Sequence, residues 1–106
     1  MKRLRFVEPL TELVLSGKKD TTWRINDEKN ITVNDELSLC GVSGEEFGRA
    51  KVIWVKMTTF ENLTKEDKEG HETFTSNEDM LATYSKYYNC KVDGKTEVKV
   101  IKFRLS

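Results

Sequence analysis

The sequence predicts an α+β domain in which the strands form a curled sheet or a small barrel. Alternation of polar and apolar residues marks most of the expected strands, and helical spacing of apolar residues marks only a few stretches between them. The expected order, β-α-β-β-β-α-α-β, lacks the strict alternation of strand and helix that builds a parallel sheet. The chain has 106 residues without repeats or a linker, which favours a single domain over residues 1–106.

The strands follow from local residue patterns. Polar and apolar residues alternate in four segments, and a fifth segment is rich in β-branched and aromatic residues. In the longest segment, Gly48 marks a candidate β-bulge. We therefore expect strands at residues 3–7, 21–25, 36–40, 47–59 and 97–105.

Three helical stretches are expected. Pro9 suits the first turn of a helix and Gly17 suits its C-terminal end, so the first helix should cover about residues 8–16. Thr64 is followed by an acidic residue three positions later, a pattern typical of a capping box. Ser76 repeats this signal, and apolar residues at helical spacing follow it.

Composition excludes several classes of protein. Hydrophobic residues make up 37% of the chain and the net charge is zero, which argues against wholesale disorder. No apolar run approaches the ~20 residues that a membrane span needs. Cys40 and Cys90 lie far apart and suit neither a zinc cage nor a disulfide scaffold. The N-terminal segment has no pattern of a signal peptide, so we expect a cytoplasmic protein.

Charge is unevenly distributed along the chain. Residues 1–24 carry six basic and three acidic residues, and residues 81–106 carry six basic and two acidic residues. In contrast, residues 61–80 carry two basic and seven acidic residues. If the first and last strands pair, as this pattern makes plausible, one face is basic and the opposite face acidic. A basic face suits a phosphate-bearing ligand, and ordinary solvated charge is the alternative.

The segment 17–24 holds the strongest candidates for chemistry, at the junction of the first helix and the second strand. Because side chains alternate along a strand, Asp20, Thr22 and Arg24 should share one face. Lys19 lies in the preceding turn and can lean over Thr22. An ammonium, a hydroxyl and a guanidinium can therefore converge. Arg24 could bind a phosphate or carboxylate, and Lys19, its pKa lowered by burial, could act as a base.

This segment resembles the hallmark of the ASCH domain family, a branch of the PUA-like superfamily. The hallmark is a Gly, a Lys two positions on and an Arg five positions beyond that Lys, matched here by Gly17, Lys19 and Arg24. The resemblance extends in order over most of the chain. It includes the preceding helix and residues 33–37, 60–64 and 100–103.

The resemblance implies a small PUA-like β-barrel of about five to six strands, with flanking helices and a cleft between barrel and helices. In the family, this cleft is proposed to bind RNA or nucleotide-like ligands. One bacterial branch removes the acetyl group of N4-acetylcytidine, using a Lys, a Thr and a Glu. Most of the family has Glu at the position of Thr22, so Thr22 favours this amidohydrolase branch.

The resemblance also implies roles for individual residues. The lysine and threonine positions fall on Lys19 and Thr22, and the third position falls on Glu72 or, by the other alignment, on His71. Glu72 is preferred because it keeps the acid. Lys19 would then take a proton from Thr22 or from a water, and Glu72 would move protons to the leaving amine. Arg24 would shape the pocket or hold the oxyanion.

Other residues are candidates for ligand binding rather than catalysis. Trp23 could stack on a base, although aromatic residues in strands usually pack in the core. His71 is the only histidine and lacks the partners that a metal site needs, but it could act as a base or contact a ligand. The hydroxyl of Tyr84 could reach the cleft. Trp54, Phe60, Tyr87 and Tyr88 are weaker candidates of the same kind.

Two functions therefore fit the sequence. The first is a metal-independent amidohydrolase that needs no cofactor and acts on an acylated nucleoside. The second is a non-catalytic RNA-binding module of the PUA-like class, whose affinity should fall steeply with salt. The expected partner is thus RNA or a modified nucleoside, without a membrane. A scaffold that keeps the fold without the site is a third alternative.

Overall fold

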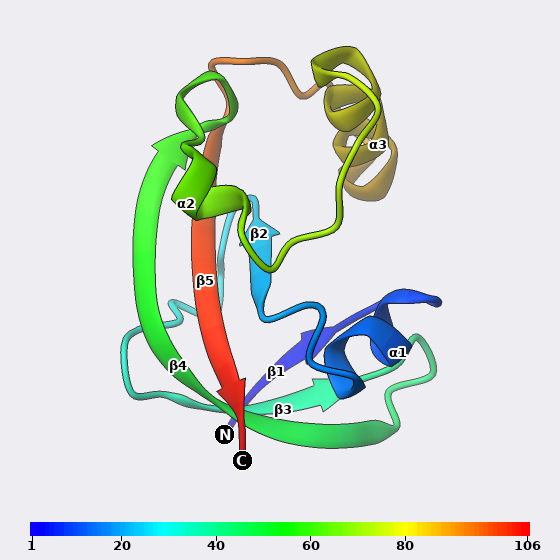
Figure 1. Cartoon of the computed structure of the whole chain (residues 1–106), viewed down its shortest axis with the longest axis vertical. Helices are drawn as coiled ribbons and strands as arrows, with labels where there is room; N and C mark the ends of the chain where they lie inside the picture. The colour runs from blue at the N-terminus through cyan, green and yellow to red at the C-terminus, as the bar shows by residue number, and fades with distance from the viewer.

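A five-stranded sheet is the framework of the computed structural model, which describes residues 1–106 (Figure 1). Strands and helices follow one another in the predicted order, and the α+β class is confirmed. The elements are β1 (Lys2–Arg5), α1 (Leu10–Leu15), β2 (Thr21–Arg24), β3 (Glu36–Cys40), β4 (Glu46–Thr59), a 3-10 turn (Phe60–Asn62), α2 (Lys65–Lys68), α3 (Asn77–Tyr88) and β5 (Glu97–Leu105).

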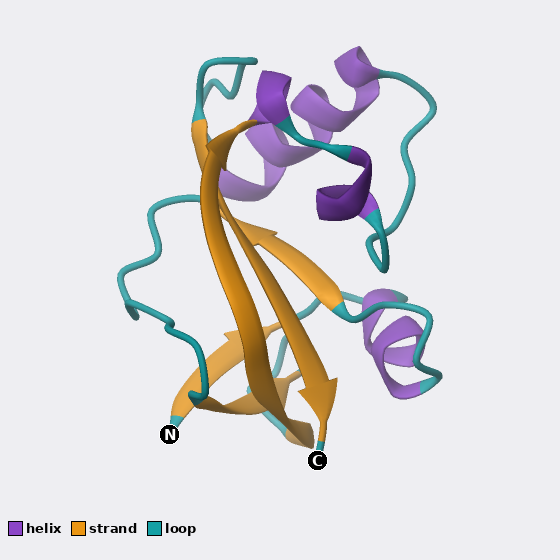
Figure 2. Ribbon diagram, turned by 60° about the vertical axis from the view of Figure 1, so that its left-hand side comes forward, coloured by secondary structure: helices purple, strands orange, loops and turns teal.

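The sheet curls into an open half-barrel. Its strand order is β1-β3-β4-β5-β2; β1 and β3 are parallel, and all other neighbours are antiparallel. The long strands β4 and β5 curve along their length, and α2 and α3 gather at one end of them (Figure 2). Because β1 and β2 are the two edge strands, the half-barrel is open between them.

Two details differ from the sequence-based expectation, and a third, the predicted bulge, is confirmed. The first and last strands do not pair: β1 pairs with β3, and β5 lies between β4 and β2. The first helix is shorter than predicted, because Pro9 is its N-cap and Gly17 follows its end with a φ of +81°. The predicted bulge beside Gly48 is present, and β4 has a second register shift between Val52 and Trp54 that increases its bend.

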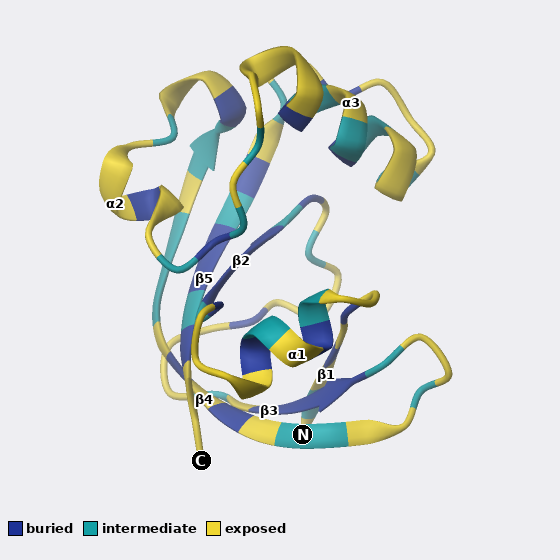
Figure 3. Ribbon diagram, turned by 45° about the vertical axis from the view of Figure 1, so that its right-hand side comes forward, coloured by how far each residue is buried: buried dark blue, intermediate teal, exposed yellow.

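Two apolar clusters stabilise the fold, and their buried residues follow the sheet and the inward faces of α1 and α3 (Figure 3). The first fills the half-barrel next to α1 and contains Leu4, Phe6, Val14, Ile31, Leu37, Leu39, Ala50, Val52, Ile101 and Phe103. The second joins β2 and β5 to α3 and contains Trp23, Ile25, Phe60, Met80, Tyr84, Val92, Val98 and Val100. None of the helices combines the length and apolar character that a membrane crossing requires.

The predicted helix caps are confirmed. The Thr64 hydroxyl accepts the Asp67 N–H at 3.2 Å, and the Asp67 carboxylate accepts the Thr64 N–H at 2.9 Å, which completes a capping box. Asp67 is buried, and the Lys56 ammonium pairs with it at 2.8 Å. The Ser76 hydroxyl accepts the Asp79 N–H at 3.0 Å and so begins α3.

The loop after α2 docks on the start of β2 through hydrogen bonds to its backbone and side chains. The carbonyl of Gly70 accepts the N–H groups of Asp20, at 2.9 Å, and Thr21, at 3.1 Å. The Thr21 hydroxyl donates to the Glu69 carbonyl at 2.8 Å, and the Trp23 indole N–H donates to the Asp67 carbonyl at 3.0 Å. These contacts fix the residues that follow Gly70 against β2.

Alanine substitutions at two glycines test how closely this loop fits. Gly17 and Gly70 both have positive φ, but a Cβ on Gly17 meets nothing within 4 Å, whereas one on Gly70 would lie 1.8 Å from Asp20 Oδ1. Gly17→Ala should cost about 1 kcal/mol of unfolding free energy through backbone strain alone. Gly70→Ala should cost roughly 1 kcal/mol more, because Asp20 must move. Denaturant unfolding measures both costs, and adding Asp20→Ala should remove the difference. Equal costs for the two single variants would contradict this description of the loop.

Candidate functional site

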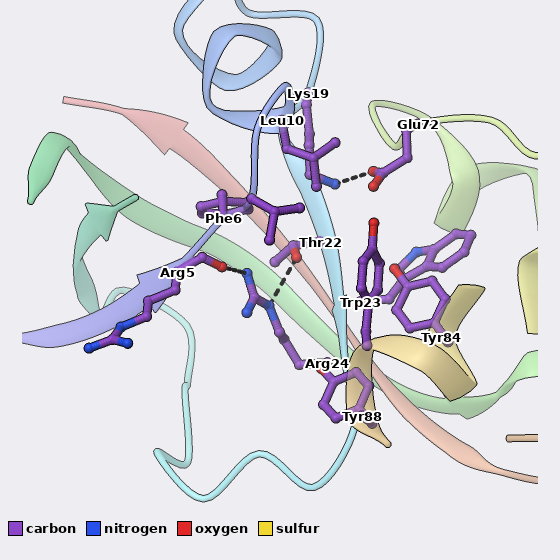
Figure 4. A pocket seen from close by; sticks show the side chains of 12 residues that line it. Arg5, Phe6, Leu10, Lys19, Thr22, Trp23, Arg24, Glu72, Tyr84 and Tyr88 are labelled. Carbon is purple, nitrogen blue, oxygen red and sulfur yellow. Dashed lines mark hydrogen bonds and ion pairs between the residues drawn. The ribbon is translucent and has the colours of Figure 1, made fainter. Parts of the chain in front are cut away.

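A cavity of about 260 Å³ opens at the free side of the half-barrel, between the end of β1, β2, α1 and α3 (Figure 4). Side chains from all four elements and from the loop after α2 form its wall. The lining residues are Arg5, Phe6, Val7, Leu10, Lys19, Thr22, Trp23, Arg24, Glu72, Tyr84, Tyr87 and Tyr88.

Lys19 enters this cavity from the turn between α1 and β2. The left-handed backbone of Gly17 ends the helix, and the Lys19 N–H donates to the Leu13 carbonyl at 3.0 Å. The Lys19 ammonium then donates to the Thr21 carbonyl at 2.7 Å and to Glu72 Oε1 at 2.5 Å. Two of its three protons therefore have acceptors in the protein, and the third is available in the cavity.

Lys19 and Glu72 form a largely buried ion pair. The side chain of Lys19 is 3% exposed and that of Glu72 is 17% exposed. Burial lowers the pKa of Lys19, although the Glu72 charge opposes this. Burial alone would raise the pKa of Glu72, but His71 and Lys19 outweigh it and hold that pKa below its ordinary value. The pair therefore rests as ammonium and carboxylate, with an amine that loses its proton more easily than a surface lysine.

Arg24 connects the two edge strands and contacts Thr22. Its Nε donates to the Thr22 hydroxyl oxygen at 3.1 Å, and its Nη2 donates to the Arg5 carbonyl at 3.0 Å across the opening between β1 and β2. The guanidinium lies over the Phe6 ring, 4.9 Å from its centroid. Since Thr22 accepts from Arg24, its own hydroxyl proton can be donated to a ligand or a base.

The structure distinguishes the two candidates for the third site position. Glu72 lines the cavity and contacts Lys19, whereas His71 lies behind the cavity wall. The His71 ring stacks on Trp23, with 3.6 Å between ring centroids. Its Nδ1 lies 2.9 Å from the Glu72 carbonyl oxygen, and its Nε2 lies 3.0 Å from the Tyr84 hydroxyl. Burial, and then the Lys19 charge, lowers the pKa of His71 to about 4.

The geometry therefore brings Lys19, Thr22, Arg24 and Glu72 together, while their chemical roles stay predictions. Asp20 was expected on the same face of β2 as Thr22 and Arg24, but it lies outside the cavity. Its carboxylate pairs with Lys102 at 3.2 Å, because β2 begins only at the next residue and the strand alternation does not include Asp20.

The aromatic candidates divide into two groups. Trp23 and Tyr84 line the cavity, but the indole N–H of Trp23 and the hydroxyl of Tyr84 are already bonded within the protein. Trp54 and Phe60 do not line it.

Sequence reasoning missed several wall residues. These are Arg5, Phe6, Val7 and Leu10, which the local sequence assigns only to a strand and a helix.

No group of three or more His, Cys, Asp or Glu side chains in the structure is arranged to hold a metal ion. Both cysteines are free; Cys40 is buried and Cys90 is exposed. The polar groups that Lys19, Glu72, Arg24 and Thr22 bring to the cavity are an ammonium, a carboxylate, a guanidinium and a hydroxyl.

Comparison with known proteins gives similarity at the level of structure. No family model and no curated protein sequence matches the chain. Among solved structures, a hypothetical protein, PH0355, is 26% identical, with each chain fully covered and a TM-score of 0.76.

Two ASCH domain structures are also similar. One is the ASCH domain of Lactobacillus crispatus, 10% identical with a TM-score of 0.67, for which the match covers 89% of this chain and 68% of the other. The second is ASCH from Zymomonas mobilis, 12% identical with a TM-score of 0.68, covering 96% of this chain and 65% of the other. The chain thus has the fold of ASCH domain proteins and spans about two thirds of the length of these two. The predicted fold is confirmed.

The buried neutral histidine predicts a specific pH dependence of stability. Its pKa is about 4 in the folded protein and near 6.5 when unfolded, so the unfolded state binds a proton first as the pH falls. His71 thus contributes stability that is fully present above pH ~6.5 and is lost as the pH falls toward about 4, by roughly 3 kcal/mol in total.

The variant His71→Gln, which cannot titrate, should lack this component. Denaturant unfolding at several pH values gives the free energy of unfolding of the wild type and of His71→Gln. The contribution of His71 is the difference between the slopes of the two free energies against pH. Parallel stability profiles from neutral pH to pH 4 would contradict the assigned burial.

Proposed function

We propose that this protein is a metal-independent amidohydrolase that removes the acetyl group from N4-acetylcytidine or a closely similar acylated nucleoside. The observation that supports this most strongly is the buried Lys19–Glu72 pair at 2.5 Å in a cavity that Thr22 and Arg24 also line. Buried ion pairs are expensive to desolvate and contribute little to stability. Clustered ionisable groups with shifted pKa values in a cavity are instead typical of catalytic sites.

The proposed reaction begins with proton transfers within the site. Glu72 takes a proton from Lys19, and the resulting amine takes the hydroxyl proton of Thr22 as its oxygen attacks the acetyl carbonyl carbon. Glu72 then gives its proton to the leaving N4 nitrogen as the C–N bond breaks. This step forms cytidine and an acetyl ester on Thr22, and it restores the ammonium and the carboxylate.

Water completes the cycle. Glu72 takes a proton from a water molecule that attacks the ester carbonyl, and returns it to the departing Thr22 oxygen. The products are the free Thr22 hydroxyl and acetic acid, which leaves as acetate after releasing its proton to solvent. Arg24 supports both steps, because its Nε–H group already contacts the Thr22 oxygen at 3.1 Å and stabilises negative charge there.

The cavity also suits the nucleoside. It opens beside aromatic side chains, Tyr87 and Tyr88 among them, that offer surfaces for a pyrimidine ring. Its volume of about 260 Å³ is of the order expected for a small ligand.

Substitutions in the site should separate chemistry from binding. With N4-acetylcytidine as substrate, Lys19→Met and Thr22→Val should each lower kcat by about 10³-fold or more, and Glu72→Gln by about 10²-fold. Lys18→Ala, which changes the neighbouring lysine outside the cavity, should have wild-type kcat. Chromatographic separation of cytidine measures these rates, and thermal unfolding checks that each variant is folded. Full activity in the folded Lys19 variant would contradict the mechanism.

An RNA-binding module is the second candidate, and the position of Arg5 favours it. Arg5 of β1 is exposed at the rim of the cavity and its guanidinium points outward (Figure 4), where it could contact a phosphate that flanks a bound base. In that case, oligonucleotide binding should weaken steeply with salt and Arg5→Ala should reduce the salt slope. Binding without release of cytidine from acetylated RNA would favour the module over the enzyme.

A further inference from the structure

His71 is the only histidine of the chain, and every polar atom of its ring has a partner inside the protein. The side chain is 1% exposed and is covered on one face by Trp23. Nδ1 lies 2.9 Å from the Glu72 carbonyl oxygen and 3.1 Å from Glu72 Oε1, and Nε2 lies 3.0 Å from the Tyr84 hydroxyl. A side chain this enclosed cannot contact a substrate directly.

The hydrogen-bond partners determine the tautomer of His71. Both partners of Nδ1 are acceptors without a proton, so Nδ1 must carry the N–H. A neutral imidazole has one N–H, which leaves Nε2 as an acceptor. The Tyr84 hydroxyl therefore donates to Nε2. Tyr84 can always do so, because burial raises its pKa well above the ordinary value and keeps the phenol protonated.

This order of donors and acceptors has a consequence for Glu72. Its Oε1 accepts from Lys19 at 2.5 Å and lies 3.1 Å from His71 Nδ1, whose hydrogen bond goes to the Glu72 carbonyl, whereas no protein group donates to Oε2. The carboxylate is therefore held by one oxygen, and the other is available for the substrate or a water. Without the Tyr84 hydroxyl, Nε2 loses its hydrogen bond, and only the Nδ1 hydrogen bond and the stacking on Trp23 hold the ring beside Glu72.

We infer that His71 and Tyr84 are positioning residues that act through Glu72: Tyr84 holds the His71 ring at Nε2, and the Nδ1–H group of His71 holds the Glu72 carbonyl and so fixes how the Glu72 carboxylate enters the cavity. This inference rests on the proposed function for its kinetic consequence. It assigns to both residues a role different from ligand binding. It also explains why a histidine beside the site is kept neutral: a charged ring would pair with Glu72 and compete with Lys19.

Tyr84→Phe tests this role, since it removes one hydroxyl and keeps the aromatic ring. With N4-acetylcytidine, kcat should fall about 10-fold while KM stays within about two-fold, as expected for a group that acts only on Glu72. Ser85→Ala is the matched control: it removes a hydrogen-bonded hydroxyl of the same helix, bonded to Leu81 and Val92 outside the cavity, and should leave kcat unchanged. Wild-type kcat in Tyr84→Phe, or a change in KM alone, would overturn the inference.

Nuclear magnetic resonance of the free protein tests the same inference without turnover. Because the chain has a single histidine, its imidazole ¹⁵N signals are unambiguous. The wild-type protein should show the Nδ1–H tautomer, and in Tyr84→Phe the Nε2 signal should shift because it has lost its hydrogen bond, while Ser85→Ala should leave it unchanged. The Glu72 carboxyl should titrate at higher pH in Tyr84→Phe and unchanged in Ser85→Ala. Lys19, Arg24 and Tyr87, the other groups whose charge or hydroxyl lies near Glu72, are the same in both variants.

The two tests fail in different ways. If the wild-type protein releases no cytidine, the proposed function fails, and the ¹⁵N and carboxyl signals still decide whether His71 and Tyr84 hold Glu72. An Nε2–H tautomer in the wild-type protein would overturn the inference even if N4-acetylcytidine were a good substrate.

Discussion

The carbonyl of Gly70 is the contact on which the site depends. It accepts the backbone N–H groups of Asp20 and Thr21, and so joins the loop after α2 to the first residues of β2. Lys19 and Glu72 are 53 positions apart in sequence, and this junction is what brings them to 2.5 Å. These backbone hydrogen bonds hold the main chain next to Lys19 and the main chain near Glu72 at a fixed separation. The ion pair alone could not do this, because both of its side chains are long and flexible.

The charges of the cavity follow from this arrangement. An isolated lysine buried to this degree would tend to lose its proton, but Glu72 supplies the opposite charge and Thr21 a carbonyl acceptor. Arg24 adds a second cation, whose N–H groups are held by Thr22 and by the carbonyl of Arg5 on the opposite edge strand. The open side of the half-barrel therefore becomes a polar cavity with fixed donors, where a closed barrel would have only a packed core.

Sequence reasoning predicted the element order, both helix caps and the side of β2 that carries Thr22 and Arg24, because these depend on local patterns. It misplaced Asp20 and paired the first and last strands, because strand ends and strand order depend on tertiary contacts. It preferred Glu72 to His71 at the third position because Glu72 keeps the acid, but local patterns could not show where either side chain lies. After the positive φ of Gly70, the structure has Glu72 in the cavity wall and His71 behind it.

The most direct measurement is a crystal structure of the Thr22→Val variant grown with N4-acetylcytidine. The variant lacks the proposed nucleophile and should retain the substrate. The account predicts the nucleoside in the cavity, with its acetyl carbonyl oxygen within hydrogen-bonding distance of Lys19 or Arg24, its carbonyl carbon facing residue 22 and its N4 nitrogen near Glu72. A nucleoside bound elsewhere, or an acetyl group directed out of the cavity toward solvent, would contradict it.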